Sequence, residues 1–265
     1  MKRRDFLTTS LAASALALTR QQSQAQTPVA GARDYYELRK YHLESGPQAK
    51  LTAAYVADAL IPALNRLGIA PIGAFHLEFG PETSTLYLLL PCANLETLVT
   101  AELRLTQDDQ FMKAADPFWN APAAAPAFVR TESSLLIAFE GYPKLTPPAA
   151  TAKHEKRIFQ LRTYESPSNR DHLRKIEMIH HGEFEIFRNA GCNQVFYGDT
   201  LVGQRMPSLT YMLSFPDLAA LTPGWDAFRN DPAWKKLSSS PRYSFEPTVN
   251  TISDLVMIPT SYSQI

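Results

Sequence analysis

Tyr36-Glu37-Leu38-Arg39-Lys40-Tyr41 is matched 123 residues later by Phe159-Gln160-Leu161-Arg162-Thr163-Tyr164. Three further pairs follow in the same order along the chain. They are Leu67-Gly68-Ile69 with Ala190-Gly191-Cys192, Leu90-Pro91 with Phe215-Pro216, and Asp116-Pro117-Phe118-Trp119 with Asp231-Pro232-Ala233-Trp234. Four matches in one order indicate an internal duplication. We refer to the two copies as the first and second repeat.

Each repeat predicts the element order β-α-β-β-α-β. In the first repeat, alternation predicts a strand at 35–42, helical spacing predicts a helix at 48–67, and Gly68 stands where a C-cap glycine belongs. Pro62 must kink this helix or begin a new segment. The remaining expected elements of this repeat are strands at 71–79, 84–90 and 130–140 and a helical region at 94–115, in two pieces.

The second repeat predicts the same elements again. We expect strands at 157–165, 193–199, 208–215 and 247–258, with helices at 169–189, 217–229 and 231–238. This order is ferredoxin-like, and such a sheet has helices on one face only, so its other face needs a partner. We therefore predict an α+β protein of two tandem ferredoxin-like units that pack sheet on sheet as a pseudo-twofold α/β barrel.

The duplicated aromatic-x-Leu-Arg-x-Tyr strands, the Gly68 and Gly191 helix stops and the two Asp-Pro-x-Trp segments resemble the NIPSNAP family, within the dimeric α/β-barrel superfamily. The resemblance spans residues 35 to about 258 and implies the ferredoxin-like fold and the barrel. It does not imply a reaction, because the superfamily includes haem-degrading and cofactor-free monooxygenases, decarboxylases and plain binding proteins.

The first residues predict an export signal rather than part of the fold. Lys2-Arg3-Arg4-Asp5-Phe6-Leu7 precedes an apolar run that is too short to span a membrane, and Ser23-Gln24-Ala25 suits cleavage. We expect a Tat signal peptide at 1–25, a flexible mature start at 26–34, the first repeat at 35–141, a proline-rich linker at 142–154 and the second repeat at 155–260. The mature protein would be periplasmic or secreted.

Composition excludes several classes of protein. The 26 basic and 26 acidic residues give no positive excess for binding a phosphate backbone, which argues against nucleic acid as a partner. No Cys/His spacing indicates a metal site, and no nucleophile elbow, phosphate loop or dinucleotide fingerprint occurs. Cys92 and Cys192 are expected to be buried free thiols, and a disulfide, which an oxidising compartment would permit, is the alternative. No motif indicates a cofactor, and a homo-oligomer stays an open alternative.

The first strand of each repeat supplies the candidate ligand-binding residues. Alternation places Arg39 and Tyr41 on one face, and Arg162 and Tyr164 on the matching face of the second repeat. We expect the apolar face to meet the helices and these four side chains to enter the barrel interior. A guanidinium suits a carboxylate or phosphate, and a phenol adds a hydrogen bond or a stacking surface. The alternative is that each arginine pairs with a carboxylate of the protein.

Two histidines are the candidate catalytic residues. His180 lies on the apolar face of the helix at 169–189, where it could act as a base or ligate haem, or form a core residue bonded to the backbone. The matching residue of the first repeat is Ala57. His76 alternates with Glu78 and would join the arginines if that face is the inner one. Trp119 and Trp234 are expected to plug the barrel ends.

The sequence therefore leaves three functions open. The first is binding of a small anionic or aromatic molecule in the barrel interior, with cofactor-free catalysis as an extension. The second is a non-catalytic interaction or scaffold protein, and the third is haem binding through His180.

Overall fold

The strands close into a single barrel in this computed structural model, which describes residues 32–265 except 81, 83 and 245–247. Its strands, in chain order, are β1 (Tyr35–His42), β2 (Gly73–Phe79), β3 (Leu86–Cys92), β4 (Arg130–Ala138), β5 (Ile158–Glu165), β6 (Asn193–Val202), β7 (Ser208–Phe215) and β8 (Thr251–Pro259). The order around the barrel is β1-β3-β2-β8-β5-β7-β6-β4, and each pairing is antiparallel.

This order contains the ferredoxin-like arrangement twice. The first repeat contributes β4-β1-β3-β2, and the second contributes β8-β5-β7-β6. The two sheets join where β2 pairs with β8 and where β6 pairs with β4, and the pseudo-twofold axis relates these two junctions. The predicted fold, two tandem ferredoxin-like units packed sheet on sheet as an α/β barrel, is confirmed. Closing the barrel leaves no unpaired sheet edge.

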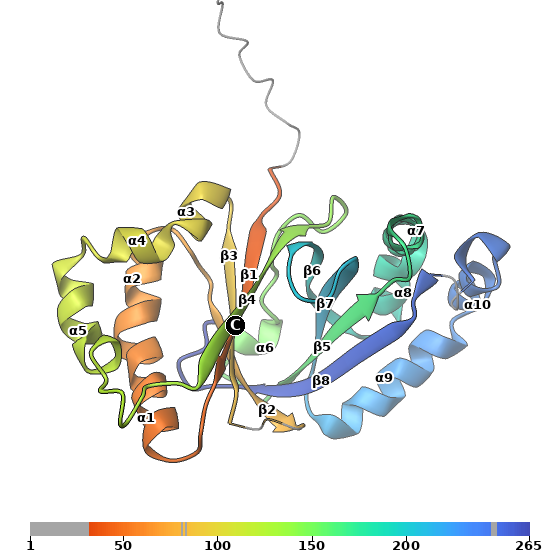
Figure 1. The fold of residues 1–265 in the computed structure, drawn as a ribbon. Coiled ribbons are helices and arrows are strands. Elements are labelled where there is room, and N and C mark those ends of the chain that lie inside the picture. The colour runs from red at the N-terminus through yellow and green to blue at the C-terminus, as the bar shows by residue number, and fades with distance from the viewer. Residues whose placement is uncertain (1–31, 81, 83, 245–247) are drawn as a thin grey trace, which may run out of the picture. The chain divides into compact units, whose positions relative to one another are not determined.

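Helices cover the outside of the barrel, with those of the two repeats on different sides (Figure 1). The first repeat has α1 (Pro47–Ala54), a π-helical turn η1 (Tyr55–Leu60), α2 (Ile61–Arg66), α3 (Leu95–Val99), α4 (Ala101–Leu105) and α5 (Asp109–Trp119). The second has α7 (Asn169–Met178), a π-helical turn η2 (Ile179–Glu183), α8 (Phe184–Asn189), α9 (Leu218–Asn230), α10 (Pro232–Ser238) and a 3₁₀ turn η3 (Pro241–Tyr243). A short helix, α6 (Ala149–Ala152), lies in the proline-rich connection.

Local signals explain where the helices begin and end. Gly68 and Gly191 adopt φ of 79° and 74°, the left-handed conformation that ends a helix with a glycine. Pro62 occupies the first turn of α2, as expected. The region at 94–115 forms three helices instead of two, because the Asp108 side chain accepts a hydrogen bond from the Phe111 amide and so starts α5 as a separate helix.

Three apolar clusters form the core. One fills the barrel interior, with Tyr36 and Leu38 from β1 meeting Phe159 and Leu161 from β5. The other two lie between the barrel wall and the helices of each repeat. Cys92 and Cys192 are buried in these separate clusters as free thiols, among the described residues. Within the same part of the chain, no helix is long and apolar enough to cross a membrane.

Candidate functional site

The predicted arginines and tyrosines lie outside the barrel, on the surface that the helices cover. Tyr41 belongs to the helix-side cluster of the first repeat and Tyr164 to that of the second, while Tyr36, Leu38, Phe159 and Leu161 fill the interior. The expectation that Arg39, Tyr41, Arg162 and Tyr164 enter the barrel interior is therefore wrong. Alternation assigned the shared faces correctly, but both faces of the barrel wall are buried against apolar clusters, so alternation alone did not decide which face points inward.

In the first repeat, two carboxylates neutralise the arginine. Arg39 is 7% exposed and donates from Nε and Nη2 to both oxygens of Glu37, at 2.7 and 3.0 Å. Its Nη1 donates to Glu102 Oε1 of α4 at 2.6 Å. Tyr41 packs edge-on against Phe118 and Phe128. A groove of about 380 Å³ borders Arg39, but Glu37 and Glu102 already neutralise the charge of this arginine.

In the second repeat, the matching arginine keeps one carboxylate partner. Arg162 Nη1 donates to Asp254 Oδ2 of β8 at 2.5 Å, and Gln160 replaces Glu37 beside it. The Arg162 Nε is buried and has no hydrogen-bond partner among the residues that the structure describes. A buried, unpaired donor calls for an explanation, and an incoming acceptor is one. Burial lowers the pKa of Arg162, but Tyr211, Tyr164 and Asp254 raise it further, so the pKa lies above its usual value. The guanidinium therefore stays charged.

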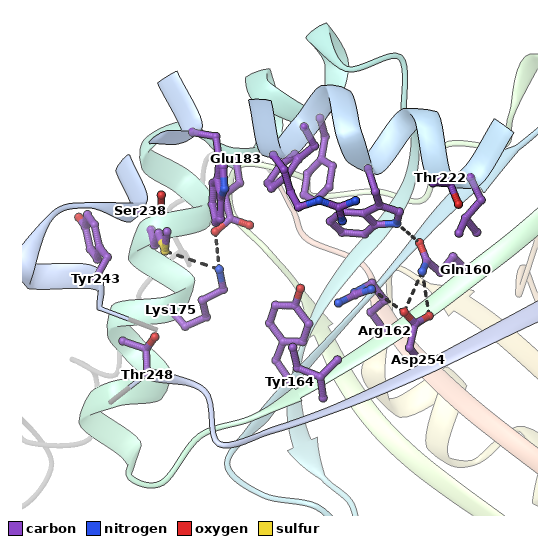
Figure 2. Close-up of a pocket in the computed structure, with 18 residues that line it drawn as sticks. Gln160, Arg162, Tyr164, Lys175, Glu183, Thr222, Ser238, Tyr243, Thr248 and Asp254 are labelled. Atoms are coloured by element: carbon purple, nitrogen blue, oxygen red, sulfur yellow. Dashed lines mark hydrogen bonds and ion pairs between the residues drawn. The ribbon is translucent and has the colours of Figure 1, made fainter. Parts of the chain in front are cut away.

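A cavity of about 400 Å³ lies above Arg162, between the barrel wall and the helices of the second repeat (Figure 2). Aromatic side chains form its upper wall: Phe187 stacks on Phe228 at 4.3 Å between ring centroids, and Trp225 meets Phe187 edge-on at 5.7 Å. Trp225 Nε1 donates to Gln160 Oε1 at 2.7 Å, and the Arg162 guanidinium lies 4.5 Å from the Trp225 ring. Tyr164 projects from β5 between Lys175 and Arg162 in Figure 2, and its hydroxyl lies 2.8 Å from that of Tyr211.

A buried ion pair closes the other end of the cavity. Lys175 of α7 and Glu183 of η2 are 3% and 2% exposed, and Lys175 Nζ donates to Glu183 Oε1. The ammonium also lies 5.4 Å from the centre of the Tyr164 ring and 5.9 Å from that of Trp234. At the offset of 123 residues, the matching positions of the first repeat are Thr52 and Leu60, both fully buried. The second repeat thus has a charge pair where the first has two uncharged buried side chains.

Sequence reasoning missed Lys175, Glu183 and Trp225. A signal for the first two was present, because aligning the repeats places a lysine and a glutamate opposite core positions. Trp225 follows Pro223-Gly224, within the helix predicted at 217–229. The structure continues α9 through both residues and places the indole over Arg162, a contact that the sequence pattern did not indicate.

The candidate histidines lie elsewhere. His180 is exposed and bound to the backbone at both nitrogens: Nδ1 lies 2.8 Å from Ile176 O, and Nε2 accepts from the Gly141 amide at 3.1 Å. His76 sits on the helix-facing side of β2, between the interior residues Phe75 and Leu77, and burial lowers its pKa. Neither lines the cavity above Arg162.

The two tryptophans of the Asp-Pro-x-Trp segments do not plug the barrel ends. Trp119 packs edge-on against Phe111 in the helix layer, and its Nε1 donates to the Tyr55 hydroxyl at 3.3 Å. Trp234 lines the cavity and lies 4.6 Å from Phe228 between ring centroids. The expected position was wrong because the first segment ends α5 and the second begins α10, and both helices cover the sheet rather than the barrel mouths.

One side of the cavity rests on a surface ion pair. Arg242 donates to both oxygens of Glu177 at 2.8 and 2.6 Å, and the Tyr243 hydroxyl donates to Glu177 at 2.8 Å. Tyr243 belongs to η3 and lines the cavity. The bonds from Arg242 and Tyr243 lower the pKa of Glu177 to about 2.

Replacing Glu177 with glutamine is expected to remove part of the acid sensitivity of the fold. A depressed carboxylate pKa contributes stability above the unfolded value of 4.5, and this contribution is lost as the pH falls toward about 2. The melting temperature of Glu177→Gln should therefore fall less steeply across that window than that of the wild type. Glu185→Gln, at an exposed position of α8, is the matched control. Parallel curves for wild type and Glu177→Gln would contradict the assignment.

Taken together, fold and site define a tandem ferredoxin-like α/β barrel whose second repeat holds an aromatic-walled cavity with a buried arginine. The family model for NIPSNAP matches twice, over residues 36–138 and 159–264, and the chain belongs to the NIPSNAP family.

Solved structures share this architecture at low sequence identity. A candidate monooxygenase from Lactobacillus acidophilus aligns with a TM-score of 0.55 at 8% identity, over 86% of this chain and 94% of that one. A second from Fusobacterium nucleatum aligns with 0.53 at 9%, over 86% and 93%. A NIPSNAP-like domain protein from Burkholderia xenovorans covers 42% of this chain and 90% of its own, with 17% identity and a TM-score of 0.37. These likenesses concern the fold alone. No curated protein matches the sequence significantly.

Proposed function

We propose that this NIPSNAP protein binds a small aromatic anion in the cavity above Arg162. The observation that carries the proposal is the contrast between the repeats. Arg39 is held by two carboxylates, whereas Arg162 has one and keeps a buried Nε without a partner among the described residues. The second repeat therefore has, in the cavity wall, a cationic side chain with one buried donor that is not paired within the described residues.

The chemistry of the walls indicates the kind of ligand. Among the lining residues, Arg162, Lys175 and Arg229 outnumber Glu183 and Asp254 by one positive charge. An acceptor at Arg162 gains a charge-assisted hydrogen bond in a site largely shielded from water. Phe187, Trp225 and Phe228 provide ring faces and edges against which an aromatic ring packs. The volume of about 400 Å³ lies within the usual range of small-molecule sites.

The cavity favours binding over the scaffold alternative. If the second repeat had only a structural role, we would expect its buried arginine to be paired as Arg39 is, with two carboxylates, Glu37 and Glu102. The second repeat instead places a buried Lys175–Glu183 ion pair in the wall of the cavity. Ion pairs in such positions are often less stabilising than apolar side chains, and a ligand that needs a polar surface accounts for their presence.

The haem alternative depended on His180, and the donors present do not fit it. Both nitrogens of His180 contact backbone groups, and its ring lies outside the cavity. The described lining of the cavity contains no histidine or cysteine, and its other side chains of a type that can ligate haem, Tyr164, Tyr243 and Met178, already contact Tyr211, Glu177 and Lys175. We therefore do not propose haem binding in this cavity.

Export by the Tat pathway is a further part of the proposal. It rests on Arg3-Arg4, the apolar run and the small residues at 23–25, all of which lie outside the described residues. It implies that the cavity meets its ligand in the periplasm or outside the cell.

Calorimetric titration with benzoate, benzamide and acetate tests the proposed function. Benzoate is expected to bind, and benzamide to bind about tenfold more weakly or worse, because a hydrogen bond to a charged group contributes about 1.5–3 kcal/mol. Acetate, which lacks the ring, should bind more weakly still. Equal affinities for benzoate and benzamide, or no heat from any aromatic acid, would contradict the proposal.

A further inference from the structure

A second cavity lies inside the barrel, at the end where β1 and β5 finish. Along the interior face of β1, the apolar Tyr36 and Leu38 give way to Lys40 and His42. On β5, Phe159 and Leu161 are followed by Thr163. The cavity has a volume of about 360 Å³, and both repeats line it. It is separate from the cavity above Arg162, which lies on the outer face of the same wall.

The floor and the walls of this cavity differ in chemistry. Leu38, Leu136, Leu161 and Leu255 form an apolar floor that continues into the barrel core. Above it, the walls carry hydroxyl groups from Thr163, Thr200, Ser208, Thr210 and Ser253. The Thr163 and Thr210 hydroxyls lie 2.9 Å apart, and Ser208 donates to Thr200 at 3.0 Å. A hydroxyl both donates and accepts, so such pairs can turn toward a hydroxylated ligand.

Cationic side chains enter the cavity from both repeats. Lys40 Nζ lies 3.8 Å from Glu132 and 5.7 Å from the Tyr87 ring centre, and it is a third exposed. Arg205 reaches in from the turn between β6 and β7, donates to Ser253 Oγ, and lies 3.6 Å from Glu165. Among the lining residues, Lys40 and Arg130 contact the carboxylate of Glu132, Arg130 and His42 contact that of Glu82, and Arg205 contacts Glu165, which lies outside the lining.

We propose that this barrel-mouth cavity binds a small polyhydroxylated carboxylate of sugar-acid size. The C–H faces of such a molecule pack on the leucine floor and Tyr87, its hydroxyls meet the threonine and serine walls, and its carboxylate lies against Lys40. The site exists only in the closed barrel, because the first repeat supplies Lys40 and the second supplies most of the hydroxyls. The two repeats differ at this position, because the residue that matches Lys40 at the offset of 123 is Thr163.

Gluconate titration followed by amide NMR tests the site. Gluconate is expected to shift the Thr163, Thr210 and Ser253 resonances, and sorbitol, which lacks the carboxylate, should bind about tenfold more weakly. Lys40→Met should weaken gluconate binding by a similar factor. Arg162→Gln, which affects the outer cavity alone, should leave it unchanged. This last comparison separates failure of this site from failure of the proposed aromatic-anion site.

Three outcomes would overturn the inference. The first is the absence of shifts at these three residues at millimolar gluconate. The second is equal binding of gluconate and sorbitol, and the third is equal binding of gluconate by wild type and Lys40→Met, because in either case the carboxylate would not be recognised. Thermal denaturation is the control that checks whether Lys40→Met is folded. We expect it to be folded, because Lys40 is partly exposed and its single ion pair is long.

Discussion

Arg162→Gln is expected to weaken benzoate binding by about tenfold to a hundredfold. The change removes a charge-assisted hydrogen bond worth about 1.5–3 kcal/mol, while glutamine retains a polar but shorter side chain. Asp254 also loses its cationic partner, although it keeps the two contacts from Gln160 Nε2 at 2.9 Å. Calorimetric titration of the purified variant with benzoate measures the effect, and thermal denaturation shows that the variant is folded.

The duplication provides the matched control for this experiment. Arg39→Gln changes the same position of the first repeat and should leave the benzoate affinity of the folded protein unchanged. Its melting temperature should fall, because Glu37 and Glu102 then lose their shared partner. Arg229→Gln, at an exposed rim position paired with Asp226, should reduce affinity only slightly. Equal losses of affinity in Arg39→Gln and Arg162→Gln, or no loss in Arg162→Gln, would contradict the assignment of the site.

Breaking the Lys175–Glu183 pair is expected to produce a large loss of stability. Lys175→Thr leaves the Glu183 carboxylate buried without its partner, and Glu183→Leu does the same to the Lys175 ammonium. Removing one member of a buried ion pair typically costs about 3–5 kcal/mol. Urea unfolding followed by circular dichroism measures the change in the free energy of unfolding.

The double variant Lys175→Thr/Glu183→Leu distinguishes a pair from two independent effects. It installs the residues that the first repeat carries at these positions, Thr52 and Leu60, and leaves no unpaired charge. We expect most of the lost stability to return, so that the double variant is far more stable than the sum of the single changes would give. Additive losses would show that the two side chains act separately.

The repeat pattern was sufficient to predict the architecture. The matched aromatic-x-Leu-Arg-x-Tyr strands fixed the position of β1 and β5, and the two glycine stops fixed the ends of the helices that follow them. Closure of the barrel followed from the uncovered face of each ferredoxin-like sheet. These inferences succeed because they depend on local periodicity and on the requirement that apolar faces be buried.

The direction in which each face points could not be predicted in the same way. In a closed barrel both faces of a strand are buried, one against the opposite wall and one against the helices. Polarity along the strand then does not decide which face is inside. The decisive contacts come from distant segments: Glu102 of α4 reaches Arg39, and Asp254 of β8 reaches Arg162.

The cavity itself depends on differences between the repeats that a single strand does not reveal. Gln160 stands where the first repeat has Glu37, and the helical pattern at 217–229 does not show that Trp225 lies over Arg162. His180 was singled out by its helical spacing, but a histidine at the end of a turn is also well placed to bind the backbone, and this is what it does.

A crystal structure of the protein with 4-bromobenzoate, measured at the bromine absorption edge, tests the central claim most directly. The account predicts one anomalous peak per chain, among Trp225, Phe187 and Phe228, with the carboxylate on Arg162 in the second repeat. A peak beside Arg39, peaks of equal height in both repeats, or an empty second-repeat cavity at saturating ligand would contradict it.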